Sequence, residues 1–384
     1  MRLSTTVLAA VVCLAATSLS PVATGFDQLT LHASPSDPKS RRLIQTSHEG
    51  APEWMTERQV EMLMQHRIRF MDITETYKDG QQLVPPFRTA LPSSLSKHKQ
   101  VEQYLQTMNT DLMKRTLEKF TSFHTRYYKS KSGSDSQRFL YGRVQDIAHR
   151  AKRHGDGQAN VTVKLFKHSW PQSSIIARFE GSKYPDEVVV IGAHQDSVNM
   201  WIPAFGRAPG ADDDGSGTVT TLEAFRALVE GNFRPERSVE FHWYSAEEAG
   251  LLGSQDVASA YNREGRKIVA MLQNDMTGFR PDPEVIGVVT DFVDGELTGF
   301  LKQLIAAYSG VQWSEMKCGY ACSDHASWNK YGFRSAFHFE TDDLQANPNV
   351  HTTGDRLETI DFNHALRYAK VSVGFAVELS SKSE

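Results

Sequence analysis

Side chains that can bind a metal ion occur in the second half of the chain, close to segments expected to be strands. The run VVVIG at residues 188–192 leads into His194, with Asp196 two residues further on. In an extended segment, residues i and i+2 face the same side, so Asp196 can reach the second ring nitrogen of His194 and hold its tautomer. An HxD motif alone is common and most often structural. Whether His194 belongs to a metal site therefore depends on the other motifs.

A run of three acids, Asp212, Asp213 and Asp214, stands between glycines ahead of an apolar helical stretch. Three adjacent carboxylates are costly unless they are solvated or paired with a cation. Acids at the start of a helix also interact favourably with its dipole. This motif alone is therefore compatible with a solvated loop and with a metal site.

Two further expected strands lead into carboxylates. Residues 239–244 are followed by Glu247 and Glu248, and residues 268–274 are followed directly by Asp275. Adjacent carboxylates at a strand end point in different directions. One of the two glutamates can therefore bind a metal ion while its neighbour acts on water held at the ion.

A second histidine, His351, lies in the sequence HTTGD, with Asp355 close enough to orient it. The motifs together supply two histidines and three carboxylates. All but the last lie at the carboxyl ends of expected parallel strands, where open α/β sheets build their sites. Nitrogen and oxygen ligands in this mixture suit zinc. The candidate ligands are His194, Asp275 and His351, together with one acid of the triplet and one of the two glutamates.

The elements that must position these residues alternate between strand-like and helical stretches, which predicts an α/β fold. We expect a single catalytic domain with a central mixed, mostly parallel β-sheet flanked by helices on both faces. The expected helices are 101–127, 137–150 and 218–230, and the expected strands are 161–165, 174–179, 188–192, 239–244, 268–274, 285–290 and 335–339.

The segment ahead of this domain divides into two parts. Residues 1–20 have the layout of a secretory signal peptide, with cleavage expected within 17–25. Residues 21–88 are polar at first and then helical from Thr56, before two prolines end the pattern. We expect 21–88 to be a propeptide that shields the site or assists folding, with a structural extension as the alternative. The catalytic domain is expected to span 89–384.

Cysteine usage agrees with export. Cys13 lies in the expected signal peptide, which leaves Cys318 and Cys322 in an oxidising compartment, where a disulfide is the default. A metal-binding or redox-active CxxxC pair is the alternative. Asn160 begins a glycosylation sequon, which is compatible with a secreted, extracellular protein.

Composition limits the partners. The 384 residues carry a formal net charge of −4 and no basic stripe with interleaved aromatics, which argues against nucleic acid. Beyond the N-terminus no apolar run is long enough to span a bilayer, so no membrane association is expected. We expect a monomer.

The motifs AHQDS, PGADDDGSG, SAEEAGLLGSQ, LQNDMT, CGYACSDHASW and HTTGD resemble those of the M28-type zinc aminopeptidases, especially the secreted bacterial and fungal leucine aminopeptidases. The similarity runs from about residue 95 to the C-terminus. It implies two zinc ions per chain, with Asp213 bridging them. The other roles that it implies are His194 and Asp275 at one zinc, Glu248 and His351 at the other, Glu247 as general base, and Tyr320 as a hydrogen-bond donor to the scissile carbonyl or its oxyanion.

The resemblance further implies an extracellular metalloaminopeptidase that removes N-terminal residues from peptides with a free N-terminus. A pocket for the first side chain would be apolar, although each of its residues can equally be core packing. Between Phe339 and His351 the chain lacks the bulky aromatics of many secreted relatives, so we expect a broad hydrophobic preference instead of strict selection of leucine. The pocket residues are Met276, Val289, Cys322, Phe339 and Val350.

Two other readings stay open. The same fold is expected to host carboxypeptidases, dipeptidases and glutaminyl cyclases, and a cyclase would bind one zinc ion. A catalytically silent, peptidase-like binding module is the third reading. Such modules lose ligands or the base, whereas all of these residues are present in this chain.

Overall fold

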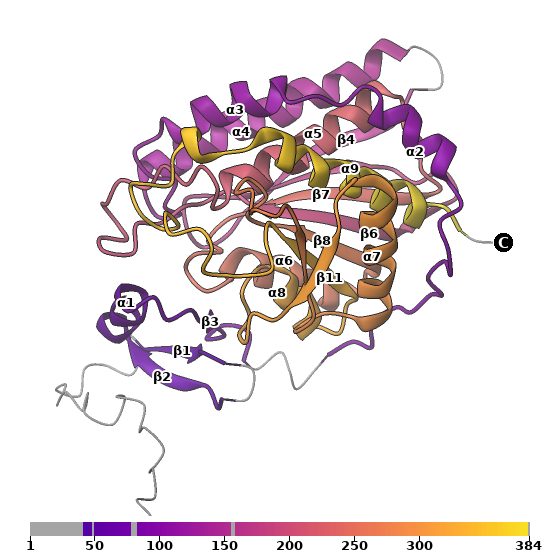
Figure 1. Cartoon of the computed structure of the whole chain (residues 1–384). Helices are drawn as coiled ribbons and strands as arrows, with labels where there is room; N and C mark the ends of the chain where they lie inside the picture. The colour runs from indigo at the N-terminus through magenta and orange to yellow at the C-terminus, as the bar shows by residue number, and fades with distance from the viewer. Residues whose placement is uncertain (1–40, 48–49, 78–82, 155–157, 383–384) are drawn as a thin grey trace, which may run out of the picture. The chain divides into compact units, whose positions relative to one another are not determined.

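The computed structural model describes residues 41–47, 50–77, 83–154 and 158–382 (Figure 1). The chain divides into residues 1–40 and a compact unit of 41–384. The expected signal peptide and the first part of the expected propeptide lie outside the described residues. Among the described helices, none has the length and apolar character that crossing a membrane requires.

An eight-stranded mixed sheet forms the centre of the 41–384 unit, in the order β10-β9-β11-β8-β6-β7-β5-β4. The inner strands β11, β8, β6 and β7 run parallel, while β5 and β4 on one side and β9 on the other pair antiparallel to their inner neighbours. The predicted fold class is therefore confirmed. The strands are β4 (Val161–Phe166), β5 (Ser174–Phe179), β6 (Tyr184–His194), β7 (Arg237–Tyr244), β8 (Lys267–Asn274), β9 (Ile286–Val289), β10 (Trp313–Met316) and β11 (Ser335–Phe339).

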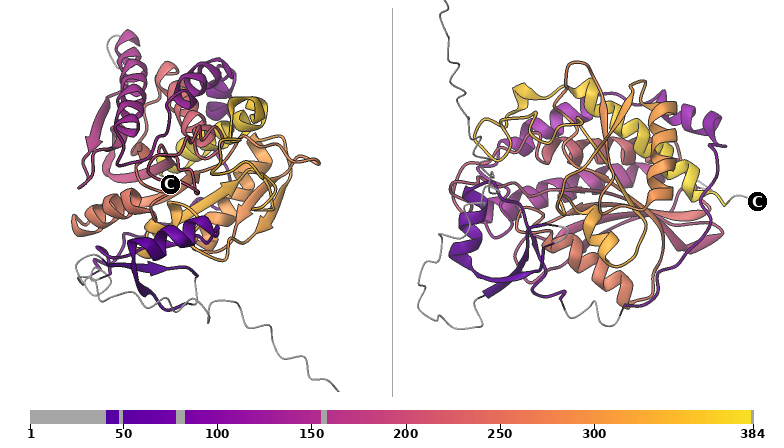
Figure 2. Two further views of the ribbon diagram at one scale, coloured as in Figure 1. Left: turned by 90° about the vertical axis from the view of Figure 1, so that its left-hand side faces the viewer. Right: turned by 60° about the horizontal axis from the view of Figure 1, so that its bottom comes forward.

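Helices cover both faces of the sheet, as Figures 1 and 2 show. One face packs against α4 (Lys131–Ala148), α5 (Gly215–Glu230), α7 (Gly295–Tyr308) and α9 (Phe362–Ser380), and the other against α6 (Leu252–Arg263) and α8 (His325–Lys330). Helices α2 (His98–Leu105) and α3 (Asp111–Thr121) pack on the outer side of α9 and α5. Short 3₁₀ helices, η3 (His149–His154) and η4 (Leu357–Thr359), complete the layers.

The single helix expected at 101–127 is in fact two helices, α2 and α3. Asn109 lies in the break between them, and its side-chain oxygen accepts a hydrogen bond from the backbone N–H of Asp111 at 3.0 Å. Asparagine competes for backbone hydrogen bonds in this way, which favours a turn over a continuous helix. The break lets the chain follow the surface of α9 and then of α5.

The order of the strands reverses at β6, which lies between β7 and β8. Helix α5 connects β6 to β7 on one face, and α6 connects β7 to β8 on the other face. At such a switch point the two connections leave in opposite directions, so a crevice opens beyond the carboxyl ends of the strands. Four of the five predicted ligands follow these same three strands, and the fifth, His351, follows β11.

Residues 41–77 form a small separate layer, which we call the N-terminal module. Its three antiparallel strands have the order β2-β1-β3 and pack with helix α1 around Ile44, Val60, Leu63 and Phe70. The helix begins after Thr56, as expected, where Thr56 and Gln59 form a capping box. It ends at Gln65, since Arg67 then adopts a left-handed φ of 57° and Met71 belongs to β3. The elements are β1 (Arg41–Gln45), β2 (Glu53–Thr56), α1 (Glu57–Gln65) and β3 (Met71–Asp72).

Candidate active site

The predicted ligands form two clusters that share Asp213. In the first, His194 Nε2 lies 3.1 Å from Asp213 Oδ1 and 3.4 Å from Asp275 Oδ1. In the second, His351 Nε2 lies 2.6 Å from Asp213 Oδ2 and 2.9 Å from Glu248 Oε2. The candidate ligand atoms within each cluster all lie within 4.8 Å of one another. Asp213 therefore presents one oxygen to each cluster, as a bridging ligand does.

These side chains fit a pair of metal ions. All five are buried, and within the described part of the chain His194 Nε2, Asp275 Oδ1 and Glu248 Oε1 have no hydrogen-bond partner. Buried polar atoms without partners are costly, because they lose their contacts with water and gain none in return. A divalent cation in each cluster would satisfy these atoms. Imidazole nitrogen and carboxylate oxygen are ligands that zinc takes.

The third acid of the triplet, Asp214, ties the ends of three elements together. Its Oδ2 accepts from the backbone N–H of His194 at 2.9 Å, at the end of β6. Its Oδ1 accepts from Gly217 at 2.8 Å, where it caps α5, and from Met276 at 3.2 Å, just beyond β8. Asp214 thereby fixes the distances between the elements that carry the first cluster.

The two acids predicted to orient histidines, Asp196 and Asp355, accept their hydrogen bonds mainly from backbone N–H groups. Asp196 lies beside His194, with 3.5 Å between Asp196 Oδ1 and His194 Nδ1, but its hydrogen bonds come from the N–H groups that follow β7. Asp355 accepts from the N–H groups of Asp212 at 2.8 Å and Asp213 at 3.1 Å. It therefore holds the backbone of Asp213, whereas the sequence predicted that it orients the imidazole ring of His351.

Three residues beside the ligands have backbone conformations that L-amino acids rarely adopt. Ala246 precedes the two glutamates with φ of 59°, Met276 follows Asp275 with φ of 55°, and His351 itself has φ of 59°. Each such residue costs about 1–2 kcal/mol relative to the right-handed region. Strain of this kind collects at functional sites, where the surrounding structure imposes it.

A buried arginine that the sequence analysis missed, Arg126, supports the loop between β6 and α5. Its Nε donates to the carbonyl of Gln195 at 2.8 Å, and its Nη2 donates to that of Gly210 at 2.8 Å. Its Nη1 donates to the carbonyl of Pro209. The guanidinium also stacks over the ring of Phe120. Nothing in the sequence near Arg126 indicates this role, because all three carbonyls lie about seventy or more positions away.

Both clusters open into a cavity of about 550 Å³. Four of the five predicted pocket residues, Met276, Cys322, Phe339 and Val350, line it. The fifth, Val289, is fully buried and packs behind Met276 and Phe339, so it supports the pocket wall without lining it.

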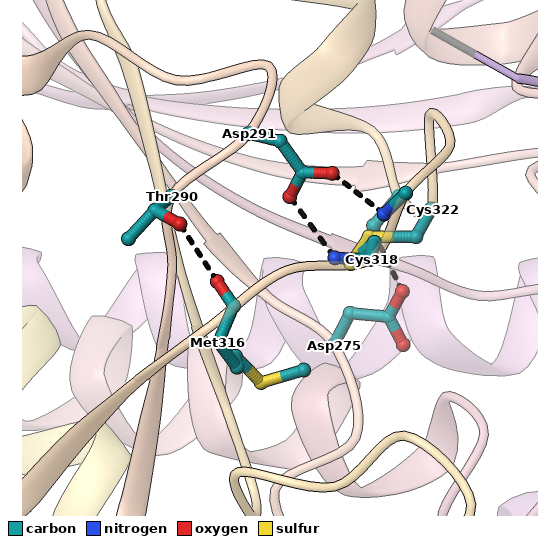
Figure 3. Close-up of a disulfide and its surroundings, with 8 residues drawn as sticks. Asp275, Thr290, Asp291, Met316, Cys318 and Cys322 are labelled. Carbon is teal, nitrogen blue, oxygen red and sulfur yellow. Dashed lines mark hydrogen bonds between the residues drawn. A yellow bond between two sulfur atoms is a disulfide. The ribbon is translucent and has the colours of Figure 1, made fainter.

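A disulfide between Cys318 and Cys322 closes the loop that carries Tyr320, as predicted. Figure 3 shows how Asp291 holds this loop by accepting hydrogen bonds from the N–H groups of Cys318 at 3.0 Å and Gly319 at 2.7 Å. Tyr320 lines the cavity. Burial raises the pKa of Tyr320 to about 12 and Arg69 opposes that effect, so the hydroxyl is protonated at neutral pH.

Glu247 lines the same cavity but belongs to neither cluster. Its Oε2 lies 4.0 Å from His194 Nε2. Burial raises the pKa of Glu247 well above its usual value; His194 opposes this and Asp275 adds to it. A carboxylate with a raised pKa beside a metal site is suited to accept a proton from water and to return it.

One further side chain reaches the second cluster from the N-terminal module. Arg69 Nη2 lies 2.8 Å from His351 Nε2, and Arg69 Nη1 lies 3.4 Å from Glu248 Oε2. Its neighbours Ile68 and Phe70 also line the cavity. The sequence indicated that this segment could shield the site, but no local pattern distinguishes Arg69 from the other arginines around it.

Two clusters of histidine and carboxylate, joined by one aspartate at the carboxyl ends of parallel strands, define the chain as an α/β metallohydrolase. The family profile described as Peptidase family M28 matches residues 174–376. The chain belongs to peptidase family M28.

Curated relatives match over nearly their whole length. Leucine aminopeptidase 1 of Sclerotinia sclerotiorum is 44% identical over 350 residues, which is 88% of this chain and 89% of the relative. Leucine aminopeptidase 1 of Aspergillus oryzae is 44% identical, with 86% and 87% covered. Among solved structures, the LapA aminopeptidase of Legionella pneumophila aligns with a TM-score of 0.78 and 28% identity, covering 90% of this chain and 99% of that chain. The family membership predicted from the motifs is confirmed.

Proposed function

We propose that the chain is an extracellular two-zinc aminopeptidase that removes hydrophobic N-terminal residues from peptides. The observation that carries this proposal is the position of Asp213, which offers one oxygen to each of two buried clusters. Glu247 stands beside them as an unliganded carboxylate, and relatives at 44% identity are named leucine aminopeptidases.

His194, Asp213 and Asp275 would hold one ion, and Asp213, Glu248 and His351 the other. Zinc ions bound there supply Lewis acidity, which polarises a carbonyl and lowers the pKa of water. Glu247 takes the proton from the attacking water at a carboxylate oxygen and returns it to the amine that leaves.

Tyr320 donates a hydrogen bond to the oxyanion that develops at the scissile carbonyl. It can do so because its hydroxyl remains protonated. The disulfide and Asp291 restrict the loop that carries it, so the donor is positioned before the substrate arrives.

The substrate's first side chain would occupy the apolar side of the cavity, against Met276, Phe337 and Phe339. The loop that follows Phe339 adds Leu344 and the polar side chains of Gln345 and Asn347 to the lining, without a large aromatic ring. This composition supports a broad hydrophobic preference. Carboxylates of both clusters and of Glu247 line this cavity, so they attract the free α-amino group and confine cleavage to the first residue.

We further propose that the chain is exported by its N-terminal signal peptide and carries residues 21–88 as a propeptide. The exposed Asn160 is accessible to glycosylation. The packing of the N-terminal module over the cavity supports a shielding propeptide, since Thr46, Met64 and Phe70 line that cavity together with the candidate ligands.

The test is hydrolysis of leucine p-nitroanilide beside its N-acetylated counterpart, before and after limited proteolysis of the secreted chain. We expect cleavage of the free-amine substrate alone, abolished by a chelator and restored by zinc. Equal cleavage of both substrates would contradict an aminopeptidase. Cyclisation of N-terminal glutamine without anilide hydrolysis would support the glutaminyl cyclase alternative.

A further inference from the structure

Arg69 makes contacts in the second cluster that a metal ion would also need. A guanidinium has hydrogen-bond donors and no acceptor. Its Nη2 lies 2.8 Å from His351 Nε2, the ring nitrogen that belongs to the second cluster. Zinc would bind the same nitrogen at about 2.0–2.1 Å. The guanidinium and an ion would therefore crowd the same side of His351, and because both are cations they would also repel each other there.

Charge leads to the same conclusion. Arg69 Nη1 lies 3.4 Å from Glu248 Oε2, so the arginine also neutralises the carboxylate that completes the second cluster. Glu248 and His351 are buried, and a permanent cation among buried carboxylates replaces part of the attraction that a metal ion would supply. The first cluster has no such contact among the described residues, since the hydrogen bonds of Arg69 go to Glu248 and His351.

The N-terminal module is anchored so that Arg69 is held in this position. The backbone N–H of Asp72 donates to the carbonyl of Gly250 at 3.1 Å, and Arg42 Nη2 donates to that of Ala249 at 2.6 Å. Gln255 Nε2 donates to the carbonyl of Asp72 at 2.8 Å. The first two anchors lie on the loop that follows Glu248 and the third lies on α6, so the module holds the same segment that supplies the candidate ligand.

Gly250 allows this close approach. It has a φ of 101°, and a Cβ added there would lie 2.7 Å from the backbone nitrogen of Asp72. Apolar contacts complete the docking, because Leu43, Met71 and Ile73 form one buried cluster with Leu251, with Ala321 inside the disulfide loop and with Ala326 on α8. The module therefore contacts both segments that carry catalytic groups, the one after β7 and the one around Tyr320.

We propose that Arg69 is a built-in substitute for the second metal ion, which keeps the intact chain in a state that binds one zinc tightly and lacks the complete pair. This inference rests on the proposed two-zinc function. Departure of the N-terminal module removes the guanidinium and frees Glu248 and His351 together. Inhibition then acts through metal occupancy as well as through coverage of the cavity.

The experiment measures zinc affinity and stoichiometry of the full chain by competition with a chelator, and compares Arg69→Gln with Arg67→Gln. Arg67 lies two residues away on the same segment, is exposed and lines the same cavity. Among the described ion pairs of the two clusters, the arginine partner is Arg69 and not Arg67. We expect the second zinc to bind about tenfold or more tightly in Arg69→Gln than in the wild type. Arg67→Gln should match the wild type. Arg69→Met serves as a second variant, and thermal unfolding of the zinc-free proteins checks that each variant is folded.

Equal affinity for the second zinc in the wild type and both Arg69 variants would overturn the proposal and leave the two-zinc function standing. In that case Arg69 would lie beside a complete metal pair. Failure of the Arg69 variants to hold more than one zinc at saturating concentration would contradict the two-zinc function itself. The zinc count thus separates the two conclusions without any assay of hydrolysis.

Discussion

Asp196 accepts a hydrogen bond from the backbone N–H of Glu247 at 3.0 Å, although 51 positions separate the two residues. Its other oxygen accepts from the N–H of Glu248 at 3.3 Å. One buried carboxylate at the end of β6 thereby positions both the candidate base and a candidate ligand at the end of β7. This contact joins the segments that follow β6 and β7, which carry the candidate ligands and the candidate base.

Asp196→Asn tests this coupling, because an amide has one acceptor oxygen and leaves one of the two N–H groups unpaired. Misplacing groups that support a metal site costs about 10- to 100-fold in activity or metal affinity. We expect kcat to fall within that range. Asp186→Asn, at an exposed position on β6, is the control and should leave kcat unchanged. An unchanged kcat in Asp196→Asn would show that the backbone holds the glutamates without Asp196.

Glu247→Gln removes the candidate base while keeping its shape. Because Glu247 belongs to neither cluster, both zinc ions should remain, whereas kcat should fall by about 10²–10⁴-fold. Zinc content and kcat are measured on the same preparation. Loss of zinc would assign Glu247 a ligand role, and near-normal turnover would rule it out as the base.

Tyr320→Phe removes the proposed oxyanion donor. Loss of one such donor lowers kcat by about 10²–10³-fold. Because burial raises the pKa of Tyr320 to about 12, the donor form persists through the neutral range. The ratio of wild-type to Tyr320→Phe kcat should therefore stay constant from about pH 6 to pH 9. A ratio that approached one below pH 9 would mean that the hydroxyl ionises earlier or has another role.

Arg126→Met should destabilise the fold without touching the metal ligands. It leaves three buried carbonyls without their donor, and each unpaired buried group costs about 1–3 kcal/mol. We expect the free energy of unfolding to drop by about 3 kcal/mol or more in urea titrations. Arg115→Met, at an exposed position on α3, should change it by less than about 0.5 kcal/mol. A similar decrease in the free energy of unfolding in both variants would show that Arg126 does not stabilise the loop between β6 and α5 through these hydrogen bonds.

The residues of the two clusters could be predicted from the sequence because each lies in a motif that can be recognised locally. His194 and Asp275 directly end or follow apolar strand runs, and Glu248 follows the last residue of β7, Tyr244, by four positions. The carboxyl ends of neighbouring parallel strands meet at one edge of the sheet. The order of the strands therefore determines whether these residues lie close together. The structure supplies that order with β6 between β7 and β8.

Features that depend on distant partners could not be predicted in the same way. Arg69 and Arg126 are ordinary basic residues in sequence, and their roles arise from atoms that the fold brings to them. Asp355 follows His351 by four positions, so the sequence predicted that it orients the imidazole ring of His351. Its carboxylate instead accepts hydrogen bonds from the backbone N–H groups of Asp212 and Asp213. The short strand β10 was missed because four largely exposed residues carry too little apolar alternation.

The most direct test of the central claim is anomalous diffraction at the zinc edge from crystals of the form that hydrolyses leucine p-nitroanilide. The account predicts two peaks about 3.5–4 Å apart. One should lie among His194, Asp213 and Asp275, and the other among Asp213, Glu248 and His351. A single peak in the active form, or two peaks that do not share Asp213, would contradict the two-zinc centre.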